Sequence, residues 1–205
     1  MSRTRSTVTS VLVVGVLLVS VLFVGGCSKS TESATDDNAT TGSQKAIPAE
    51  KNPPGDIPDT QAFVPYTTTG GVSLKVLEGW ARTVSSNSAE FTDKLNTIRV
   101  TWEQTSTPTT AASVAITDVA KLMASEPAFQ LVSINSVKLP AGTSVRMIYR
   151  VNGTANDVTG KRYRMDVERY TVFKNGKRVD LTLISPVGAD NVDAWRTVSR
   201  SLAWK

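Results

Sequence analysis

A two-residue turn, Asn175-Gly176, most constrains the fold of this chain, because strand-like segments flank it on both sides. Asn-Gly is a typical pair for a type I′ turn, whose twist joins two antiparallel strands directly. The flanking segments run from Lys161 to Phe173 and from Val179 to Ile184. The sequence therefore predicts a long antiparallel hairpin, and with it a sheet whose neighbouring strands run in opposite directions.

The first strand of this hairpin changes its apolar face along its length. Met165 and Val167 share one face, whereas Tyr170 and Val172 fall on the other because strand side chains alternate. An extra residue in a strand restores such a phase shift. We expect a β-bulge near Glu168 and Arg169.

Further strands and two helices follow from the same periodicities. Alternation predicts strands around Ile98, Val100 and Trp102 and from Val145 to Val151, and residues 72–76 are also extended. Two sets of apolar residues each recur at helical spacing and predict two helices. The first set is Ile116, Val119, Ala120 and Met123, and the second is Val192, Trp195, Val198 and Leu202. Asp190 is the expected N-cap of the second helix. The order of elements predicts an α+β domain with an antiparallel sheet flanked by helices.

The N-terminus predicts export and anchoring. Arg3 and Arg5 precede an uncharged apolar run from Val11 to Val24, and Gly25-Gly26 lead to Cys27, the chain's one cysteine. The run has the length of a signal-peptide core. Its end resembles a bacterial lipobox, at which a peptidase cuts before a lipidated cysteine. An uncleaved membrane helix is the alternative, because the wider uncharged stretch approaches the length of a span.

This interpretation divides the chain into three parts. We expect a lipoprotein signal peptide over residues 1–26, a lipidated Cys27 with a flexible linker over residues 27–58, and a globular domain over residues 59–205. The linker is rich in Ser, Thr, Asp and Pro and holds only Ile47 and Ile57 as large apolar residues, so it cannot build a core. The domain is then held at the cell membrane by acyl chains such as palmitate and faces away from the cytoplasm.

The run Leu74-Lys75-Val76-Leu77-Glu78-Gly79-Trp80 gives a strand that ends at a Gly-Trp turn. Together with the intervening helix, the central hairpin and a closing helix from Trp195 to Leu202, it resembles the PsbP-like domain found in many actinobacterial lipoproteins. The resemblance implies an α/β/α sandwich. Leu77 stands where such proteins often have proline.

Composition removes most catalytic chemistries. The chain has no histidine, and its single cysteine is assigned to the anchor, so histidine-dependent triads and thiolate metal sites are excluded. Nucleotide-binding glycine motifs are absent from the sequence. We therefore expect no metal, no cofactor and no catalytic residue. The remaining enzymatic hypothesis is a wall-glycan hydrolase that uses Asp166 and Glu168 as paired carboxylates, although Arg164 and Arg169 flank them and favour surface ion pairs.

A basic run along the hairpin is the main candidate binding patch. Its members are Lys161, Arg162, Arg164, Arg169, Lys174, Lys177 and Arg178. Such a patch would attract anionic lipids, wall polymers or a protein partner, and the full chain carries a formal charge of +5. The solvated face and tip of a hairpin explain the same residues more simply, because strand alternation already accounts for most of these positions. Trp80, Trp102, Trp195 and Trp204 are expected to pack in the core rather than line a groove.

These observations favour a non-catalytic binding or accessory domain, monomeric in itself, that serves an envelope complex or a transporter. Its expected partners are the membrane, through Cys27, and an envelope protein complex or an anionic wall polymer. We expect no nucleic acid. A carrier of an apolar ligand such as a lipid is the alternative from another class.

The anchor gives a direct test. Metabolic labelling with an alkyne fatty acid is expected to mark the wild-type protein and to leave Cys27→Ala unlabelled, because the thiol is the site of acylation. The variant is also expected to keep its leader, which intact mass measurement detects. Equal labelling of both proteins would contradict the lipobox interpretation.

Overall fold

The structure is a computed structural model that describes residues 44–156 and 159–205. The predicted signal peptide, Cys27 and the first half of the predicted linker lie outside the described residues. Within the described ranges, no helix is both long and apolar enough to cross a membrane. The described residues all belong to one compact unit of the chain.

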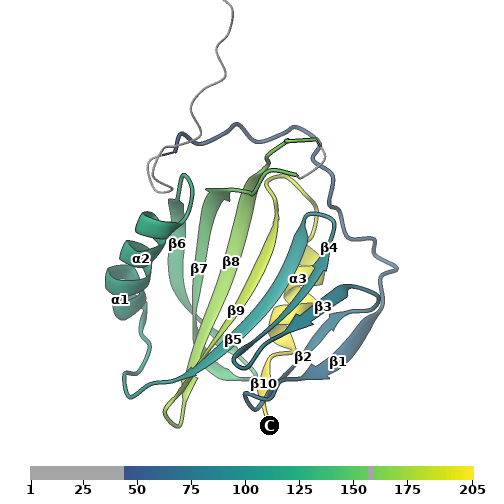
Figure 1. The fold of residues 1–205 in the computed structure, drawn as a ribbon. Coiled ribbons are helices and arrows are strands. Elements are labelled where there is room, and N and C mark those ends of the chain that lie inside the picture. Colours follow the sequence, from purple (N-terminus) through teal and green to yellow (C-terminus); the bar gives the residue numbers. More distant parts are fainter. Residues whose placement is uncertain (1–43, 157–158) are drawn as a thin grey trace, which may run out of the picture. The chain divides into compact units, whose positions relative to one another are not determined.

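The main layer is a seven-stranded antiparallel sheet, with strands in the order β3-β4-β5-β9-β8-β7-β6 (Figure 1). Its strands are β3 (Ala81–Val84), β4 (Ser88–Asp93), β5 (Asn96–Gln104), β6 (Gln130–Leu139), β7 (Gly142–Asn152), β8 (Arg164–Lys174) and β9 (Lys177–Pro186). This arrangement confirms the predicted α+β class and the strands expected at Ile98 and Val145.

The predicted hairpin lies at the centre of this sheet as β8 and β9. Lys174 and Lys177 are the last paired residues before the turn. Asn175 has φ 50° and Gly176 has φ 73°, which is the double left-handed conformation of a type I′ turn. The hairpin prediction is confirmed.

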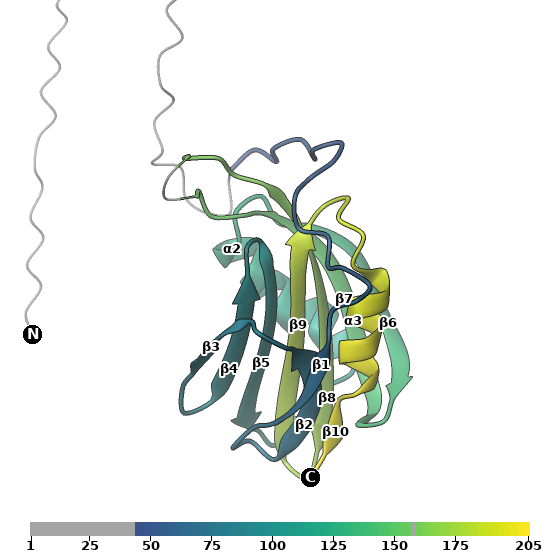
Figure 2. The same cartoon turned by 90° about the vertical axis from the view of Figure 1, so that its right-hand side faces the viewer.

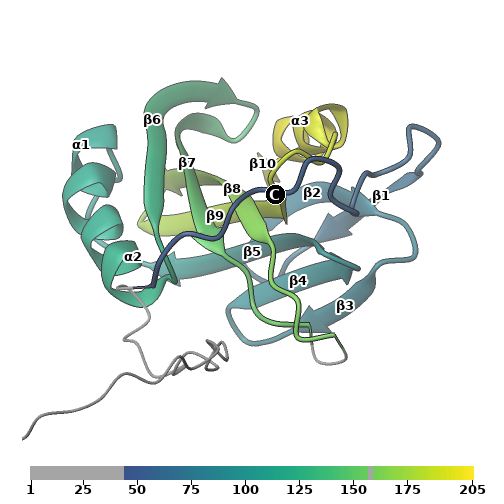
Figure 3. The ribbon, with the colours of Figure 1, turned by 90° about the horizontal axis from the view of Figure 1, so that it is seen from above.

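The sheet is covered on both faces (Figures 2 and 3). One face packs against α3 (Val192–Arg200) and a small sheet of β1 (Phe63–Thr67), β2 (Val72–Leu77) and β10 (Ala203–Trp204). The other face carries α1 (Ala111–Ser113), the π-helical segment η2 (Val114–Asp118) and α2 (Val119–Ser125). Two separate apolar cores result, and the sheet lies between them.

Strand β8 serves both cores without a bulge. Its pairing with β7 and β9 is continuous through Glu168 and Arg169, so the predicted bulge is wrong. Met165 and Val167 belong to the core under α1–α2, whereas Tyr170 and Val172 belong to the core under α3. The strand changes its buried face because each core covers a different half of its length. A register shift occurs in β6 instead, between Leu131 and Ser133.

The helix predicted around residue 116 exists, and Val119 of the predicted stripe packs against the core, but the buried face is turned away from the rest of that stripe. Ile116 and Met123, from the predicted apolar stripe, are 73% and 58% exposed. Val114 and Asp118 are buried instead. The charged residue faces inward because two arginines of the sheet bind it, as described below.

The second predicted helix is confirmed as α3, with Trp195 and Val198 buried and Leu202 buried just beyond its end. Two details differ from the prediction. Val192 is exposed, and the residue at the N-cap position is Asn191 rather than Asp190. The Asn191 side chain makes no cap bond because it is occupied by the N-terminal segment.

Residues 45–57 pack on the domain, in contrast to the expected flexible linker that ends at residue 58. Ile57 is buried, and its amide donates to Asn191 Oδ1 at 2.7 Å. Asn96 and Asn191 both donate to the carbonyl oxygen of Gly55. Asn152 donates to the Lys45 carbonyl and accepts from the Ile47 amide. The segment is held by backbone hydrogen bonds to buried asparagines, which apolar patterning does not reveal.

Removal of this segment is expected to destabilise the domain. A chain that begins at Asp59 removes the bonds that residues 45–57 make to three buried asparagine side chains, Asn96, Asn152 and Asn191. Asn96 and Asn191 keep their bond to each other and Asn152 keeps Arg164, but each buried group left unsatisfied costs about 1–3 kcal/mol. For a domain of this size, a loss of about 3 kcal/mol lowers the thermal midpoint by roughly 6–12 °C. Differential scanning calorimetry against a chain that begins at Gln44 measures the change. Equal midpoints would show that the segment contributes nothing.

Candidate functional site

The helical layer formed by α1, η2 and α2 covers only part of the sheet face on which it lies. It lies over β6, β7 and the first half of β8, where Val145, Met147 and Val167 are apolar. On β5 and β9 the same face presents polar side chains, including Thr101, Asp180 and Thr182. A polar strip of sheet therefore remains beside α2.

This strip is hollowed along α2 into two adjoining cavities of about 240 and 520 Å³. The two share four lining residues, which are Thr101, Leu122, Arg169 and Asp180. We call the combined hollow the α2 groove. One end of the larger cavity is apolar, with Leu95, Val151 and Met165, and its rim carries Lys94 and Arg99. A groove with aliphatic walls and a few placed polar groups is typical of binding sites.

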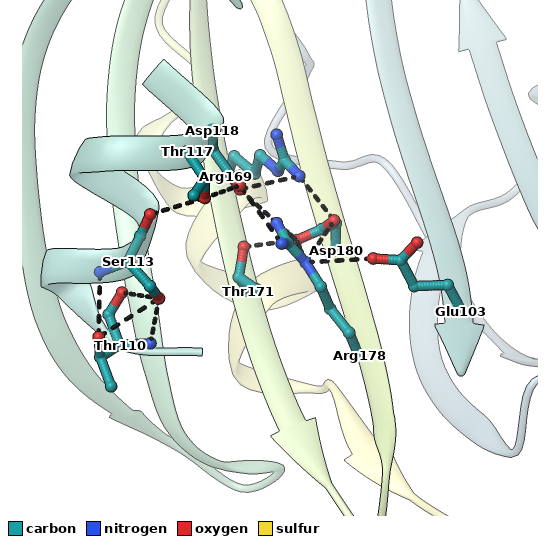
Figure 4. Close-up of polar contacts among 9 residues, drawn as sticks. All are labelled: Glu103, Thr110, Ser113, Thr117, Asp118, Arg169, Thr171, Arg178 and Asp180. Carbon is teal, nitrogen blue, oxygen red and sulfur yellow. Dashed lines mark hydrogen bonds and ion pairs between the residues drawn. The ribbon is translucent and has the colours of Figure 1, made fainter. Parts of the chain in front are cut away.

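A network of ion pairs forms the floor where the two cavities meet (Figure 4). Arg169 Nη2 lies 2.6 Å from Asp180 Oδ2 and 3.5 Å from Asp118 Oδ2. Arg178 binds Asp118 directly and lies 3.2 Å from Asp180 Oδ2. Thr171 donates to Asp180 Oδ1 at 2.5 Å. Two cations and two anions thus neutralise one another, and we call these four residues the ion network.

The network shifts the pKa values of two of its members, Asp118 and Arg178. Burial by itself raises the pKa of Asp118, but the hydrogen bond and charge of Arg178, together with the charge of Arg169, outweigh it and leave the pKa below its ordinary value. Burial lowers the pKa of Arg178, yet its bonds to Asp118 and Asp180 hold that pKa above the usual range. Asp118 and Arg178 therefore stay charged at neutral pH.

The π-helical segment η2 brings Asp118 to this network. The preceding helix α1 is capped by Thr110. The Thr110 hydroxyl accepts from the amide of Ser113, and the Ser113 hydroxyl accepts from the amide of Thr110. Thr117 donates to Asp118 Oδ1 at 3.1 Å and so fixes the carboxylate. π-Helical turns often occur at functional sites, because they displace side chains from the α-helical pattern.

One polar atom in the floor has no partner. Arg169 Nε is buried and, among the described residues, no acceptor binds it. The Arg169 side chain is only 17% exposed and lines both cavities. Unsatisfied buried donors are uncommon and mark places where a ligand or water can be bound.

The seven predicted basic residues do not form one patch. Arg169 and Arg178 belong to the ion network. Arg164 is buried and donates to the Ala128 carbonyl, Asn152 and Gln130. Lys161 pairs with Glu50, and Lys177 donates to the Gly70 carbonyl. Arg162 is half-buried and Lys174 is exposed.

The paired carboxylates of the enzymatic hypothesis lie on the opposite face of the sheet. Asp166 binds Arg150 at 2.8 Å, and Glu168 binds Arg146 and Tyr170. Both acids thus act as partners in cross-strand ion pairs. Within residues 44–156 and 159–205, no three metal-ligating side chains come together.

The tryptophans mainly pack against the core under α3. Trp80 meets Trp195 edge to face, with ring centroids 6.3 Å apart. Trp204 donates to the Ala141 carbonyl at 2.8 Å. Trp102 lies directly against Gly70 and also touches the smaller cavity. The expected packing role fits these positions.

Solved structures show a likeness to this chain. The solution structure of cyanobacterial PsbP (CyanoP) from Synechocystis sp. PCC 6803 has a TM-score of 0.53 and 16% identity, and the match covers 75% of this chain and 100% of that one. LpqN of Mycobacterium tuberculosis, described as involved in cell envelope biogenesis, has a TM-score of 0.45 and 14% identity, covering 71% and 91%. The yeast Saccharomyces cerevisiae Ran-binding protein Mog1p has a TM-score of 0.47 and 10% identity, covering 71% and 96%.

The cyanobacterial likeness shows that the chain has the PsbP-like fold. The predicted fold is therefore confirmed. A scan of protein-family models finds no match, and neither does a search among curated proteins. The geometry of the α2 groove is therefore the basis for inferring a function.

The ion network predicts a specific acid sensitivity. Because the folded-state pKa of Asp118 is depressed, its stabilisation is present above the unfolded value near 3.8 and is lost as the pH falls through the folded value. Asp118→Asn is expected to cost roughly 3 kcal/mol at pH 7, the lower end for breaking a buried pair. Urea unfolding at pH 7 and pH 3 measures the difference, which should shrink at the lower pH. Asp193→Asn, on an exposed pair, is the control and should cost under about 0.5 kcal/mol.

Proposed function

We propose that this protein is a membrane-anchored, extracytoplasmic lipoprotein whose PsbP-like domain acts by binding, as an accessory component of an envelope complex or transporter. The α2 groove is the proposed binding site. The observation that carries the proposal is the polar half-face of the sheet, left open beside α2 and hollowed above the ion network.

The ion network suits recognition better than catalysis. Its two carboxylates are each bound by arginine, and neither is available as a general base. The pairs fix the floor of the groove in one shape, and charges already paired need little reorganisation when a partner arrives. On the rim, Arg99 is paired with Glu90, whereas Lys94 is exposed and favours a partner with an acidic group.

A second candidate is the carriage of an apolar ligand, and one observation favours it. The larger cavity has a volume of about 520 Å³, and its apolar end includes Leu95, Tyr149 and Ile184. Burial raises the pKa of Tyr149 to about 12, so its hydroxyl remains neutral there. A ligand in this end would co-purify with the protein, and native mass spectrometry of the intact protein detects it.

Site-directed photocrosslinking in native membranes tests the accessory role. A photoreactive residue at Lys94, on the rim, is expected to capture one defined protein. Thr182→Trp fills the floor of the groove and is expected to reduce capture at least about tenfold, which corresponds to about 1.4 kcal/mol. Lys75→Trp, on the exposed face of β2, is the matched control and should leave capture unchanged.

Two results would contradict the proposal. Capture that is unaffected by Thr182→Trp would place the partner outside the groove. Capture of many proteins in equal amounts, with no defined adduct, would show that the rim has no specific partner.

A further inference from the structure

The N-terminal segment joins the domain beside the end of α2. Lys45 and Ile47 are held by the side chain of Asn152, at 2.9 and 3.1 Å. Asn152 ends β7, and its amide donates to the carbonyl of Pro127, just beyond α2. The first described residues of the chain are therefore held beside the end of α2 (Figures 1 and 3). We call this attachment the exit point.

Arg164 ties this exit point to the turn between α2 and β6. Its Nη1 donates to Asn152 Oδ1 at 3.2 Å and to the Ala128 carbonyl at 2.8 Å. Its Nη2 donates to Gln130 Oε1 at 3.2 Å. The side chain is buried, so the exit point and the turn are joined through buried hydrogen bonds. They form one rigid corner.

Exposed apolar side chains flank the same turn. Met123 lies in the last turns of α2 and is 58% exposed, whereas Leu131 and Val132 begin β6 and are 41% and 51% exposed. These are three of the six large hydrophobic side chains that are exposed among the described residues. All three fall within ten positions of one another, around the residues that Arg164 binds. Val132 also lines the cavity on the α3 face of the sheet, whereas Leu131 pairs with Tyr149 on the α2 face. We therefore call Met123 and Leu131, which flank the turn on the α2 face, the apolar corner.

We propose that the apolar corner rests on the lipid bilayer and orients the domain there. The inference depends on the proposed anchor at Cys27. A chain spans at most about 3.6 Å per residue, so the 18 steps from Cys27 to Lys45 hold the exit point within roughly 65 Å of the anchored cysteine. Lys45 is thus the described point at which the proposed tether reaches the domain.

The surroundings of the corner suit a bilayer surface. Lys45, at the exit point, is exposed. Lysines beside apolar side chains are typical of surfaces that lie in the interface of an anionic membrane. Met123 and Leu131 are flexible enough to enter the acyl region while the hydrogen-bonded backbone of the corner stays outside it.

Lipid photolabelling of the full-length, acylated protein tests the inference. The protein is reconstituted in phosphatidylglycerol and phosphatidylethanolamine vesicles that contain a trace of diazirine-bearing phospholipid. Trypsin then releases one peptide, Leu122–Lys138, that contains the whole apolar corner. A second peptide, Thr83–Lys94, contains the exposed Val84 of the edge strand β3 and serves as the internal control.

We expect Leu122–Lys138 to carry at least about fivefold more lipid label than Thr83–Lys94. The double variant Met123→Glu with Leu131→Glu should lose most of this label. The matched variant Val84→Glu with Val192→Glu changes two side chains that are equally exposed elsewhere, and it should retain the label. Circular dichroism and thermal midpoints establish that both variants are folded, and Met123→Ser with Leu131→Ser replaces the first variant if it is not.

Other outcomes separate the inference from the anchor. An acylated protein whose label is spread evenly, or concentrated outside Leu122–Lys138, overturns the apolar corner and leaves the anchor intact. A mass for the N-terminal peptide without acyl chains overturns the anchor, whatever the label shows. If the same peptide crosslinks to a protein in native membranes and carries no lipid in vesicles, the corner is a protein contact and the inference is wrong.

Discussion

The pairing of Asp118 with Arg178 and Arg169 determines how the helices lie on the sheet. Because this carboxylate points inward, Ile116 and Met123 of the same helix point outward. The pairing also anchors the helical layer over β8 and β9, beside a strip of sheet that it leaves open. Buried ion pairs contribute little net stability compared with an apolar contact, but they permit few alternative arrangements. In this domain, that restriction sets the position of the α2 groove.

The same network explains the change of face along β8. One face of β8 lies under the helices. Along this face, Met165 and Val167 come first, and Arg169 and Thr171 follow from the middle of the strand onward. Polar groups at these positions are compatible with burial because Asp180 of the neighbouring strand satisfies them. Apolar residues move to the other face, where α3 and the small sheet cover Tyr170 and Val172. A strand of this kind needs no bulge to serve two cores.

The features that depend on residues close together in the chain were predicted correctly from the sequence. The turn Asn175-Gly176, the alternation at Ile98 and the class of the fold needed only neighbouring residues. The orientation of the first helix could not be predicted, because the partners of Asp118 lie 51 and 60 residues further along the chain. The packing of residues 45–57 was missed for a similar reason, since Asn96, Asn152 and Asn191 satisfy its backbone and carry no apolar signal. The groove was missed because its floor is a set of charges that resembles a solvated strand face.

The proposed membrane contact and the α2 groove share part of the structure. Asn152, which holds the N-terminal segment, also lines the larger cavity, together with Glu126 and Pro127 from the end of α2. Arg164 joins these residues to the start of β6. If the apolar corner rests on the bilayer, this end of the groove lies near the membrane surface, and the ion network lies further away. A membrane-embedded partner would then meet the apolar end of the groove first, so the orientation given by the corner and recognition by the groove would act on the same partner.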